Sequence, residues 1–284
     1  MDNREDARRA NGDFVEALAR GLDVIKAFGP TSMALSVSDV AARTALARPT
    51  ARRLLLTLEQ LGYVRSHQGI FTLTTKTLEL GTACIAAQGI WDIAEPHLAA
   101  LVAQTRESSS MSQLDGSDIV YTARVSVPKI IALSVHIGTR FPAVATSMGR
   151  VLLADLDTDE LDEVLSTPSQ SGIIPRVTPT RSELDASLAE IRERGWAMSD
   201  ELLSVGIRSI AAPVKDRDGR TLAAMNVTVH AAETSIAELT QRHLPLLLAT
   251  ARAVTEEWAN LAKLPARELR PQSSAVRRRS RPTP

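Results

Sequence analysis

Residues 36–74 read SVSDVAARTALARPTARRLLLTLEQLGYVRSHQGIFTLT, and this stretch decides how the N-terminal part of the chain folds. It opens on Ser36-Val37-Ser38-Asp39, a capping-box pattern in which the serine hydroxyl accepts from the third N–H of a short helix. That helix is expected to break near Thr44–Leu46. A new helix starts at Arg48-Pro49, where a proline loses no hydrogen bond. Gly62 ends this second helix as its C-cap.

Two short β-type stretches follow, at Tyr63–Ser66 and Ile70–Thr74, and His67-Gln68-Gly69 between them forms a hairpin-sized loop. Upstream, one set of apolar residues recurs at helical spacing before Gly29-Pro30 stops the helix: Val15, Leu18, Leu22, Ile25 and Phe28. Three helices and a hairpin predict a winged helix-turn-helix domain over residues 1–74. The helical run Leu78–Ala87 predicts a connector helix within residues 75–89.

In a helix-turn-helix the second helix of the motif lays its N-terminal turn in the major groove of DNA. One face of that helix is apolar: Ala51, Leu54, Leu55, Leu58 and Leu61. The first four of these residues are expected to face the core. The candidate DNA contacts are therefore Arg48, Pro49, Thr50, Arg52 and Arg53, with Arg65, His67 and Gln68 from the wing. An arginine can place two parallel donors on guanine O6 and N7. The alternative is a solvated helix whose arginines only keep it soluble.

The distribution of charge favours one DNA-binding end. Residues 1–80 carry 11 Lys and Arg against 9 Asp and Glu, whereas residues 81–263 carry 16 against 23. Between Arg43 and Lys76 the only acidic residue is Glu59. A basic patch on a chain with no formal net charge indicates a polyanionic partner for that patch alone. The acidic middle of the chain would repel DNA.

From Ile90 onward the chain alternates between helical and β-type patterns. Strands are expected at Ser109–Leu114, Ile119–Val125, Ile130–Ile137, Ile207–Val214 and Leu222–Val229. Helices are expected around Ile93–Val102 with Pro96 near its start, and at Ser147–Leu153, Leu184–Arg194 and Ile236–Leu261. This mixture predicts an α/β or α+β sensor-sized domain over residues 90–263. The tail, residues 264–284, carries 6 basic side chains against 1 acidic and is expected to stay disordered.

Composition limits the class of protein. No apolar run approaches the roughly 18 residues that cross a membrane, and residues 1–12 do not read as a secretion signal. The lone Cys84 excludes an internal disulfide and fits the cytoplasm. The 5 histidines are scattered, and the chain lacks a Gly-x-Ser-x-Gly elbow, a Gly-x-Gly-x-x-Gly fingerprint and a Walker loop. We therefore expect no metal site, no cofactor and no enzymatic activity.

Several motifs resemble the IclR family of bacterial transcriptional regulators: LARGL at 18–22, RRLL at 52–55, LEQLGY at 58–63, LELG at 78–81, ATSMGRVLLA at 145–154 and GIRSIAAPV at 206–214. The likeness covers about residues 14–262. DIVYTARV at 118–125 is most similar to the branch that regulates protocatechuate, 4-hydroxybenzoate and β-ketoadipate catabolism. The resemblance implies a GAF-like effector-binding domain, homodimers through the DNA-binding domains and often dimers of dimers.

The resemblance also implies an effector pocket at Met148, Gly149, Ser199, Ser209, Asn226 and Thr228. Asn226 and Thr228 are two apart on an expected strand and so share one face. Polar groups there need partners, which an oxygen-rich ligand, the backbone or water would supply. Ser199 stands where some family members that bind small oxo-acids carry an acidic residue, which argues against glyoxylate-like effectors and favours a larger or aromatic acid. The expected effector is an aromatic or dicarboxylic acid. Arg124, on a strand face with Val120 and Thr122, is either a partner for the effector carboxylate or a solvated side chain.

The sequence therefore predicts a transcriptional regulator with three partners: double-stranded operator DNA, a small organic acid and a second copy of itself. Two alternatives remain at this point. An enzyme with a DNA-binding appendage would turn over its ligand. A DNA-binding protein without an effector would have no use for the roughly 170 further residues that follow the winged helix.

Overall fold

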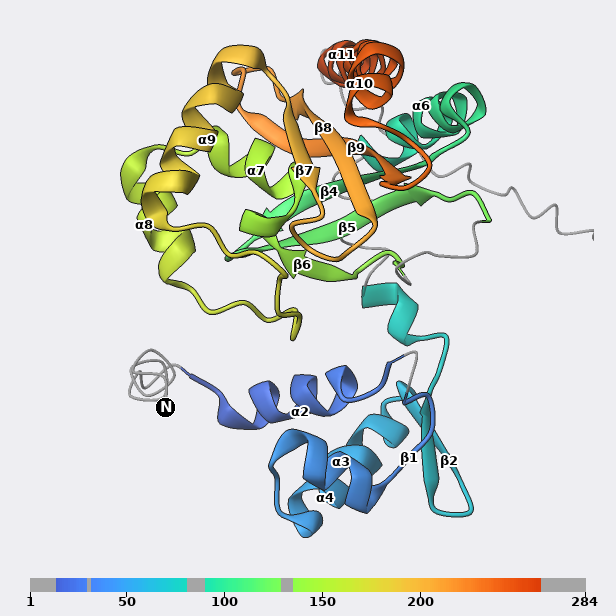
Figure 1. Cartoon of the computed structure of the whole chain (residues 1–284). Helices are drawn as coiled ribbons and strands as arrows, with labels where there is room; N and C mark the ends of the chain where they lie inside the picture. Colours follow the sequence, from blue (N-terminus) through green and yellow to red (C-terminus); the bar gives the residue numbers. More distant parts are fainter. Residues whose placement is uncertain (1–13, 30–31, 81–89, 129–134, 262–284) are drawn as a thin grey trace, which may run out of the picture. The chain divides into compact units, whose positions relative to one another are not determined.

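The computed structural model describes residues 14–29, 32–80, 90–128 and 135–261. The chain divides into two compact units, Met1–Gln88 and Gly89–Pro284 (Figure 1). Several sequence predictions lie outside the described residues: most of the connector helix, Cys84, most of the run 130–137 and the basic tail. Residues 77–80 of the connector are helical, and residues 135–137 do not form the predicted strand.

The first unit contains the helices α2 (Glu16–Lys26), α3 (Val37–Thr44) and α4 (Arg48–Gln60). The predicted signals at their ends are confirmed. The Ser36 hydroxyl accepts from the Asp39 N–H at 3.3 Å, and the Asp39 carboxylate accepts from the Ser36 N–H at 2.8 Å. After α4, Gly62 has a φ of +82°, and the Tyr63 N–H donates to the Leu58 carbonyl at 2.9 Å. Local hydrogen bonds thus determine where α3 begins and where α4 ends.

A small antiparallel sheet of order β1-β3-β2 completes this unit, from β1 (Leu35–Ser36), β2 (Val64–His67) and β3 (Ile70–Leu73). The predicted three-residue loop is wrong, because His67 pairs with Ile70 and only Gln68 and Gly69 form the turn. These two residues have φ values of +50° and +80°, the left-handed conformation that a two-residue hairpin turn needs. The two-residue strand β1 was too short for its pattern to be predicted.

The exposed face of α2 carries large apolar side chains. Val24 and Phe28 are buried in the core of the unit, whereas Leu18 and Leu22 are 64% and 44% exposed. The apolar residues at helical spacing therefore include exposed side chains, Leu18 and Leu22, as well as the buried Phe28. Leu61, at the end of the apolar face of α4, is also exposed. The outward residues line an apolar groove formed by Ala17, Leu18, Gly21, Leu22, Ile25, Leu54, Thr57, Leu58, Leu61, Tyr63 and Leu80.

The second unit is built on a six-stranded antiparallel sheet of order β6-β5-β4-β9-β8-β7. Its strands are β4 (Ser108–Asp115), β5 (Asp118–Val125), β6 (Arg140–Pro142), β7 (Ala197–Asp200), β8 (Ile207–Lys215) and β9 (Thr221–His230). One face is covered by α6 (Ile90–Thr105), α10 (Ile236–Glu238), the π-helical segment η2 (Leu239–His243) and α11 (Leu244–Leu261). The other is covered by the short turn η1 (Ala143–Ala145) and by α7 (Ser147–Ala154), α8 (Thr158–Ser166) and α9 (Arg181–Arg194), as Figure 1 shows.

This architecture confirms the predicted α+β class and the predicted strands that form β4, β5, β8 and β9. Three details differ from the predictions. The elements β6, β7 and α8 were not predicted, and Pro96 lies well inside α6 rather than near its start. The expected continuous helix over 236–261 contains η2 just before Pro245, whose missing N–H interrupts the regular hydrogen-bond pattern.

Each face of the sheet has its own apolar core. Leu98, Met111 and Leu247 belong to the core beneath α6 and α11. Met148 and Leu188 belong to the core beneath α7 and α9. The sheet is therefore buried on both sides, and a polar side chain on its α7 face has to find a partner within the protein or in a ligand.

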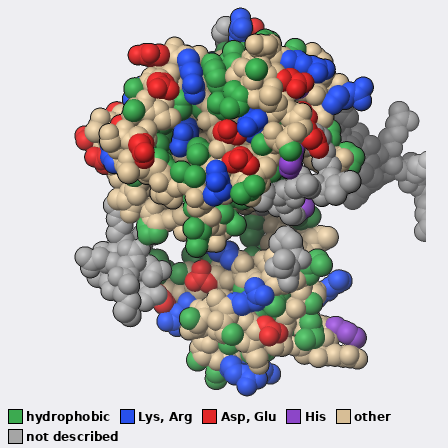
Figure 2. Space-filling model, viewed as in Figure 1, with side chains coloured by type: hydrophobic (Ala, Val, Ile, Leu, Met, Phe, Trp, Pro, Cys, Tyr) green, Lys and Arg blue, Asp and Glu red, His purple; other side chains and the backbone are tan. Residues whose placement is uncertain are grey.

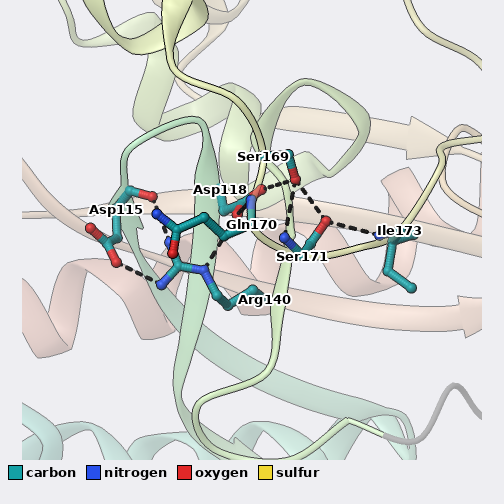
Figure 3. Close-up of polar contacts among 7 residues, drawn as sticks. All are labelled: Asp115, Asp118, Arg140, Ser169, Gln170, Ser171 and Ile173. Atoms are coloured by element: carbon teal, nitrogen blue, oxygen red, sulfur yellow. Dashed lines mark hydrogen bonds and ion pairs between the residues drawn. The ribbon is translucent and has the colours of Figure 1, made fainter. Parts of the chain in front are cut away.

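The loop between α8 and α9 is fastened to the sheet by Asp118 (Figure 3). This side chain is only 1% exposed, and it accepts from the Ser169 hydroxyl at 2.6 Å and from the Gln170 N–H at 2.7 Å. Arg140 donates to it at 3.3 Å and also forms an ion pair with Asp115 at 2.6 Å. The buried carboxylate thus joins β5, β6 and the loop.

Candidate functional site

The predicted DNA contacts lie at the start of α4 and on the wing of the first unit. Thr50 is half-buried, and the other seven are exposed: Arg48, Pro49, Arg52, Arg53, Arg65, His67 and Gln68. The three arginines of α4 make no ion pair with any residue that the structure describes. Figure 2 shows blue Lys and Arg side chains on the surface of this unit. Their guanidinium groups are therefore available to an external anion.

The wing is held to α4 by a carboxylate. Glu59 accepts from the N–H of Ser66 at 2.8 Å and from its hydroxyl at 2.6 Å. Beside it, the Arg65 Nε donates to the Thr72 hydroxyl across the hairpin at 3.1 Å. The one acidic residue of the basic stretch therefore has a structural role, and it positions the wing relative to α4.

The ammonium group of Lys76 is already bound within the protein, unlike the exposed arginines of α4. Its Nζ donates to the Leu61 carbonyl at 3.0 Å and lies 5.2 Å from the centre of the Tyr63 ring. A cation at the C-terminus of a helix interacts favourably with the carbonyl groups that have no helical partner. Lys76 therefore stabilises the end of α4.

The acidic side chains of α8 are exposed: Asp159, Glu160, Asp162 and Glu163. Red side chains gather over this part of the second unit in Figure 2. Glu160 completes a capping box with Asp157, and Asp162 forms an ion pair with Arg181. Capping and surface solvation account for this cluster.

A cavity opens between the sheet of the second unit and the N-terminus of α7. Six of the seven predicted effector residues line it: Arg124, Met148, Ser199, Ser209, Asn226 and Thr228. Gly149 does not. A Cβ at that position would lie 2.1 Å from the Ala143 carbonyl oxygen, so this glycine lets α7 pack against η1. Gly149 thus shapes the wall without contacting the cavity.

A β-bulge in β5 brings two wall residues together. Ser110 pairs with Arg124 and Ser112 pairs with Tyr121, which leaves Thr122 as an extra residue on β5. A bulge re-aims the side chains that follow it. Arg124 therefore does not share its face with Val120 and Thr122 as expected from simple alternation. It lines the cavity together with Tyr121.

The polar floor of the cavity is a hydrogen-bonded chain. The Arg124 Nη1 donates to the Ser110 hydroxyl at 2.9 Å, and the Ser110 N–H donates to the Asn226 Oδ1 at 2.9 Å. The Asn226 Nδ2 in turn donates to the Thr228 hydroxyl at 2.9 Å. Burial lowers the pKa of Arg124, which lies without an ion pair in the described part of the chain. A half-buried cation without a counterion favours an anionic ligand.

The opposite wall is built by serines around the start of α7. The Ser147 and Ser209 hydroxyls lie 2.7 Å apart, and the Ser199 hydroxyl donates to the Ala145 carbonyl at 3.2 Å. The Thr146 hydroxyl caps α7 by accepting from the Gly149 N–H at 3.0 Å. The other N–H groups of a first helical turn have no partner in their own helix. This wall offers hydroxyl groups that can donate or accept.

Aromatic residues complete the cavity, and sequence reasoning missed them. The Tyr121 and Phe141 rings meet edge to face, with centroids 5.6 Å apart. Burial raises the pKa of Tyr121 to about 12, so its phenol stays neutral at ordinary pH. Ser147 was also missed, although it directly precedes Met148 in a motif that the sequence singled out. Phe141 lay on a strand too short to predict.

No group of three or more His, Cys, Asp or Glu side chains in the described residues could hold a metal ion. None of the helices in those residues is long and apolar enough to cross a membrane. The described side chains of the cavity wall that can contact a ligand through polar atoms or rings are its serines and threonines, Asn226, Arg124, Glu107, His230 and its two aromatic rings.

A winged helix-turn-helix together with a second unit that holds a cavity of polar and aromatic residues defines a ligand-responsive DNA-binding regulator. Residues 17–68 match the IclR helix-turn-helix domain, and residues 82–256 match the C-terminal domain of bacterial IclR transcriptional regulators. The chain belongs to the IclR family of bacterial transcriptional regulators. The predicted function, effector-modulated regulation of transcription, is confirmed.

Similar proteins agree with this assignment. The chain is 39% identical over 241 residues to the Pca regulon regulatory protein of Pseudomonas putida. The match covers 84% of this chain and 83% of that protein. A crystal structure from Rhodococcus sp. RHA1 matches at 44% identity and a TM-score of 0.76, covering 87% of this chain and 100% of that one. The PobR inducer-binding domain of Acinetobacter, solved as a double mutant with 3-hydroxybenzoic acid, matches at 30% identity and a TM-score of 0.52, covering 58% and 97%.

Proposed function

We propose that the effector of this regulator is an aromatic acid bound between β5, β9 and α7. The observation that carries the proposal is Arg124, a half-buried cation with no ion pair in the described residues, beside the edge-to-face pair Tyr121 and Phe141. A carboxylate would supply the missing counterion, and a ring would pack against the aromatic wall. The likeness to a Pca regulon regulator and to a domain that binds 3-hydroxybenzoic acid supports the same class. Met148, Ser199, Ser209, Asn226 and Thr228 would form the rest of the contact surface, with Gly149 behind them.

The effector proposal is tested by thermal unfolding with hydroxybenzoates and protocatechuate, because a ligand that binds the folded state raises the midpoint temperature. Thr228→Val keeps the volume of the side chain and removes its hydroxyl. We expect it to weaken binding by about threefold to tenfold, the value of one hydrogen bond. Thr250→Val, on α11 and outside the cavity wall, removes a hydroxyl that bonds only the Leu246 carbonyl and should leave binding unchanged. If no aromatic acid shifts the parent protein, the proposed effector class is wrong.

On the DNA side, we propose that Arg48, Thr50, Arg52 and Arg53 enter the major groove and that the wing contacts the backbone. The domain limits 1–74, 75–89 and 90–263 belong to this proposal, with DNA and effector bound in different domains. Because the protein turns over no ligand in this scheme, incubation with an aromatic acid should return the acid unchanged. A cytoplasmic location follows from the need to reach the chromosome.

Arg52→Ala should weaken operator binding by about tenfold to a hundredfold, the value of one good arginine–guanine pair. The fold should stay intact because the side chain is exposed. Arg65→Ala serves as the comparison: a phosphate contact should lower affinity for every sequence and reduce the salt slope by about 1. Fluorescence anisotropy with operator and unrelated DNA at several salt concentrations measures both effects. Equal loss on both DNAs for Arg52→Ala would refute its role in base readout.

We also propose that the apolar groove of the first unit binds a second copy of the chain, as the resemblance implies. Leu18, Leu22 and Leu61 are exposed large apolar side chains on one groove, a surface that soluble monomers rarely leave open. Leu18→Glu would place a charge in the contact. Analytical ultracentrifugation should then find a shift towards monomer and a matching loss of operator affinity. If Leu18→Glu still forms the dimer, the contact lies elsewhere on the chain. In the parent protein, a further species at twice the mass of the dimer would be the dimer of dimers.

A further inference from the structure

The free edge of the wing is bonded to α4 by one side chain. In the sheet order β1-β3-β2, strand β3 has a neighbour on both sides, and β1 pairs with it as far as Ile70. Strand β2 is an edge, so its outward N–H groups have no neighbouring strand to accept them. The N–H and the hydroxyl of Ser66 both donate to one oxygen of Glu59, at 2.8 Å and 2.6 Å. Glu59 thus takes the place of a neighbouring strand for this part of β2.

The tip of the hairpin depends on this bond more than its base does. At the base, Val64 and Phe71 are buried in the core of the first unit. At the tip, every residue from 65 to 70 is exposed. A segment with few buried contacts opens locally at a low cost in free energy. Removal of the Glu59 carboxylate should therefore loosen the tip of the wing and leave the fold of the unit intact.

The same bond determines where the cationic side chain of the wing points. Successive side chains of a strand point to opposite faces, so Arg65 and His67 share the face that Ser66 does not. The Arg65 Nε donates to the Thr72 hydroxyl on the neighbouring strand, which uses one of its five N–H donors. With Ser66 fixed against Glu59, the guanidinium of Arg65 is presented in one orientation to an external anion.

The charge of Glu59 acts in the other direction. It is the only acidic residue between Arg43 and Lys76, and a carboxylate within a basic stretch repels a polyanion. The hydrogen bonds of this side chain and its charge should therefore change DNA affinity with opposite signs. A substitution at this position shows which of the two effects is larger.

We propose that Glu59 is a positioning residue for DNA recognition, whose carboxylate holds the wing in the orientation in which Arg65 meets the DNA backbone. This inference rests on the wing contact of the proposed function and adds the residue that maintains it. A wing that is ordered before binding loses less conformational freedom on the DNA than a wing that is ordered only there. Loss of the acceptor should therefore weaken DNA binding, the opposite of what loss of the negative charge alone predicts.

Two substitutions of Glu59 separate its charge from its hydrogen bonds. Glu59→Gln and Glu59→Ala remove the same charge, but glutamine keeps a side-chain oxygen that can accept from Ser66. Fluorescence anisotropy compares the full-length variants on a duplex that the parent protein selects from a random pool and on a scrambled duplex of equal length. Glu59→Ala should bind both duplexes about threefold to tenfold more weakly than Glu59→Gln, the value of one hydrogen bond. Equal affinities of the two variants would overturn the proposal.

Arg65→Ala, made in both variants of Glu59, shows whether the bond acts through the wing. In Glu59→Gln it should lower affinity and reduce the salt slope by about 1, as in the parent. In Glu59→Ala it should change both quantities little, because the loosened wing no longer holds this side chain against the DNA. Equal losses in the two backgrounds would mean that the two sites are independent and would overturn the proposal. A parent protein insensitive to Arg65→Ala would instead reject the wing contact itself, and the proposal with it.

Far-UV circular dichroism and the unfolding midpoint check that each variant folds. If Glu59→Ala does not fold, Ser66→Ala takes its place, because it removes the hydroxyl bond and keeps the N–H bond. It should bind DNA about twofold more weakly and reduce the effect of Arg65→Ala; no change in either would overturn the proposal. Hydroxyl-radical footprinting gives a second measurement. Loss of protection only where the wing meets the backbone is expected, and a uniform loss along the duplex would contradict a positioning role.

Discussion

Gly149→Ala is expected to destabilise the second unit by about 3 kcal/mol or more, the upper end of what overpacking costs in a protein core. The added Cβ would lie 2.1 Å from the Ala143 carbonyl oxygen and 2.4 Å from its Cα. Both are backbone atoms, so no side chain can rotate away. Either α7 or η1 has to move, and both border the cavity. Thermal unfolding followed by circular dichroism measures the loss, and aromatic-acid binding should fall with it.

The chain offers a matched control in another helix. Gly21 lies inside α2, and a Cβ built there has no heavy atom within 4 Å. Gly21→Ala should therefore be neutral or stabilise the first unit by up to about 1 kcal/mol, the usual gain from replacing a helical glycine. Because Gly21 lines the groove proposed to bind a second copy, sedimentation of this variant checks that its oligomeric state is that of the parent. A Gly149→Ala protein as stable as its parent would mean that α7 and η1 are not packed as described.

Asp118→Asn should cost about 2–3 kcal/mol, because hydrogen bonds to a buried charged group are among the more valuable ones. The amide keeps one acceptor oxygen for donors on Ser169, Gln170 and Arg140, and its NH2 group would face a donor. The loop between α8 and α9 should detach first. Limited proteolysis within residues 167–180 and chemical denaturation together measure the effect.

Asp115→Asn is the control for this variant, since both carboxylates pair with the same arginine (Figure 3). The Asp115 side chain is 66% exposed against 1% for Asp118. Exposed ion pairs contribute about 1 kcal/mol or less, so Asp115→Asn should change stability and proteolysis little. Equal losses for the two variants would show that the ion pair with Arg140, and not the tether to the loop, holds this region together.

The elements of the first unit could be predicted closely because the ends of its helices depend on residues that are near in sequence. The Ser36–Asp39 capping box, Pro49 in the first turn of α4 and Gly62 after its end all act within a few residues. The orientation of α2 could not be predicted in the same way. Its apolar residues occupy two faces, and periodicity within one helix does not say which face the rest of the unit covers. The helical spacing of Leu18 and Leu22 thus predicted the helix but not that these two side chains are exposed.

In the second unit, alternation placed Asn226 and Thr228 on one face of β9, and the structure agrees. The same rule failed on β5, because the bulge at Thr122 shifts the alternation and turns Arg124 towards Tyr121. A bulge of this kind depends on the partner strand, which a reading of β5 alone does not contain. Short strands such as β6 and β7 were missed for a similar reason. Three or four residues are too few to show an alternating apolar pattern, and such strands form because they hydrogen-bond to a neighbouring strand.

The placement of the aromatic residues gives the protein built-in spectroscopic reporters. The chain has 2 tyrosines, Tyr63 beneath Lys76 at the end of α4 and Tyr121 in the cavity wall. Its 3 tryptophans all belong to the second unit. Fluorotyrosine labelling would therefore give two fluorine resonances, one from each unit, without any engineered label. Intrinsic tryptophan emission follows the second unit alone, so the two units can be observed separately in one sample during a titration with DNA or with an aromatic acid.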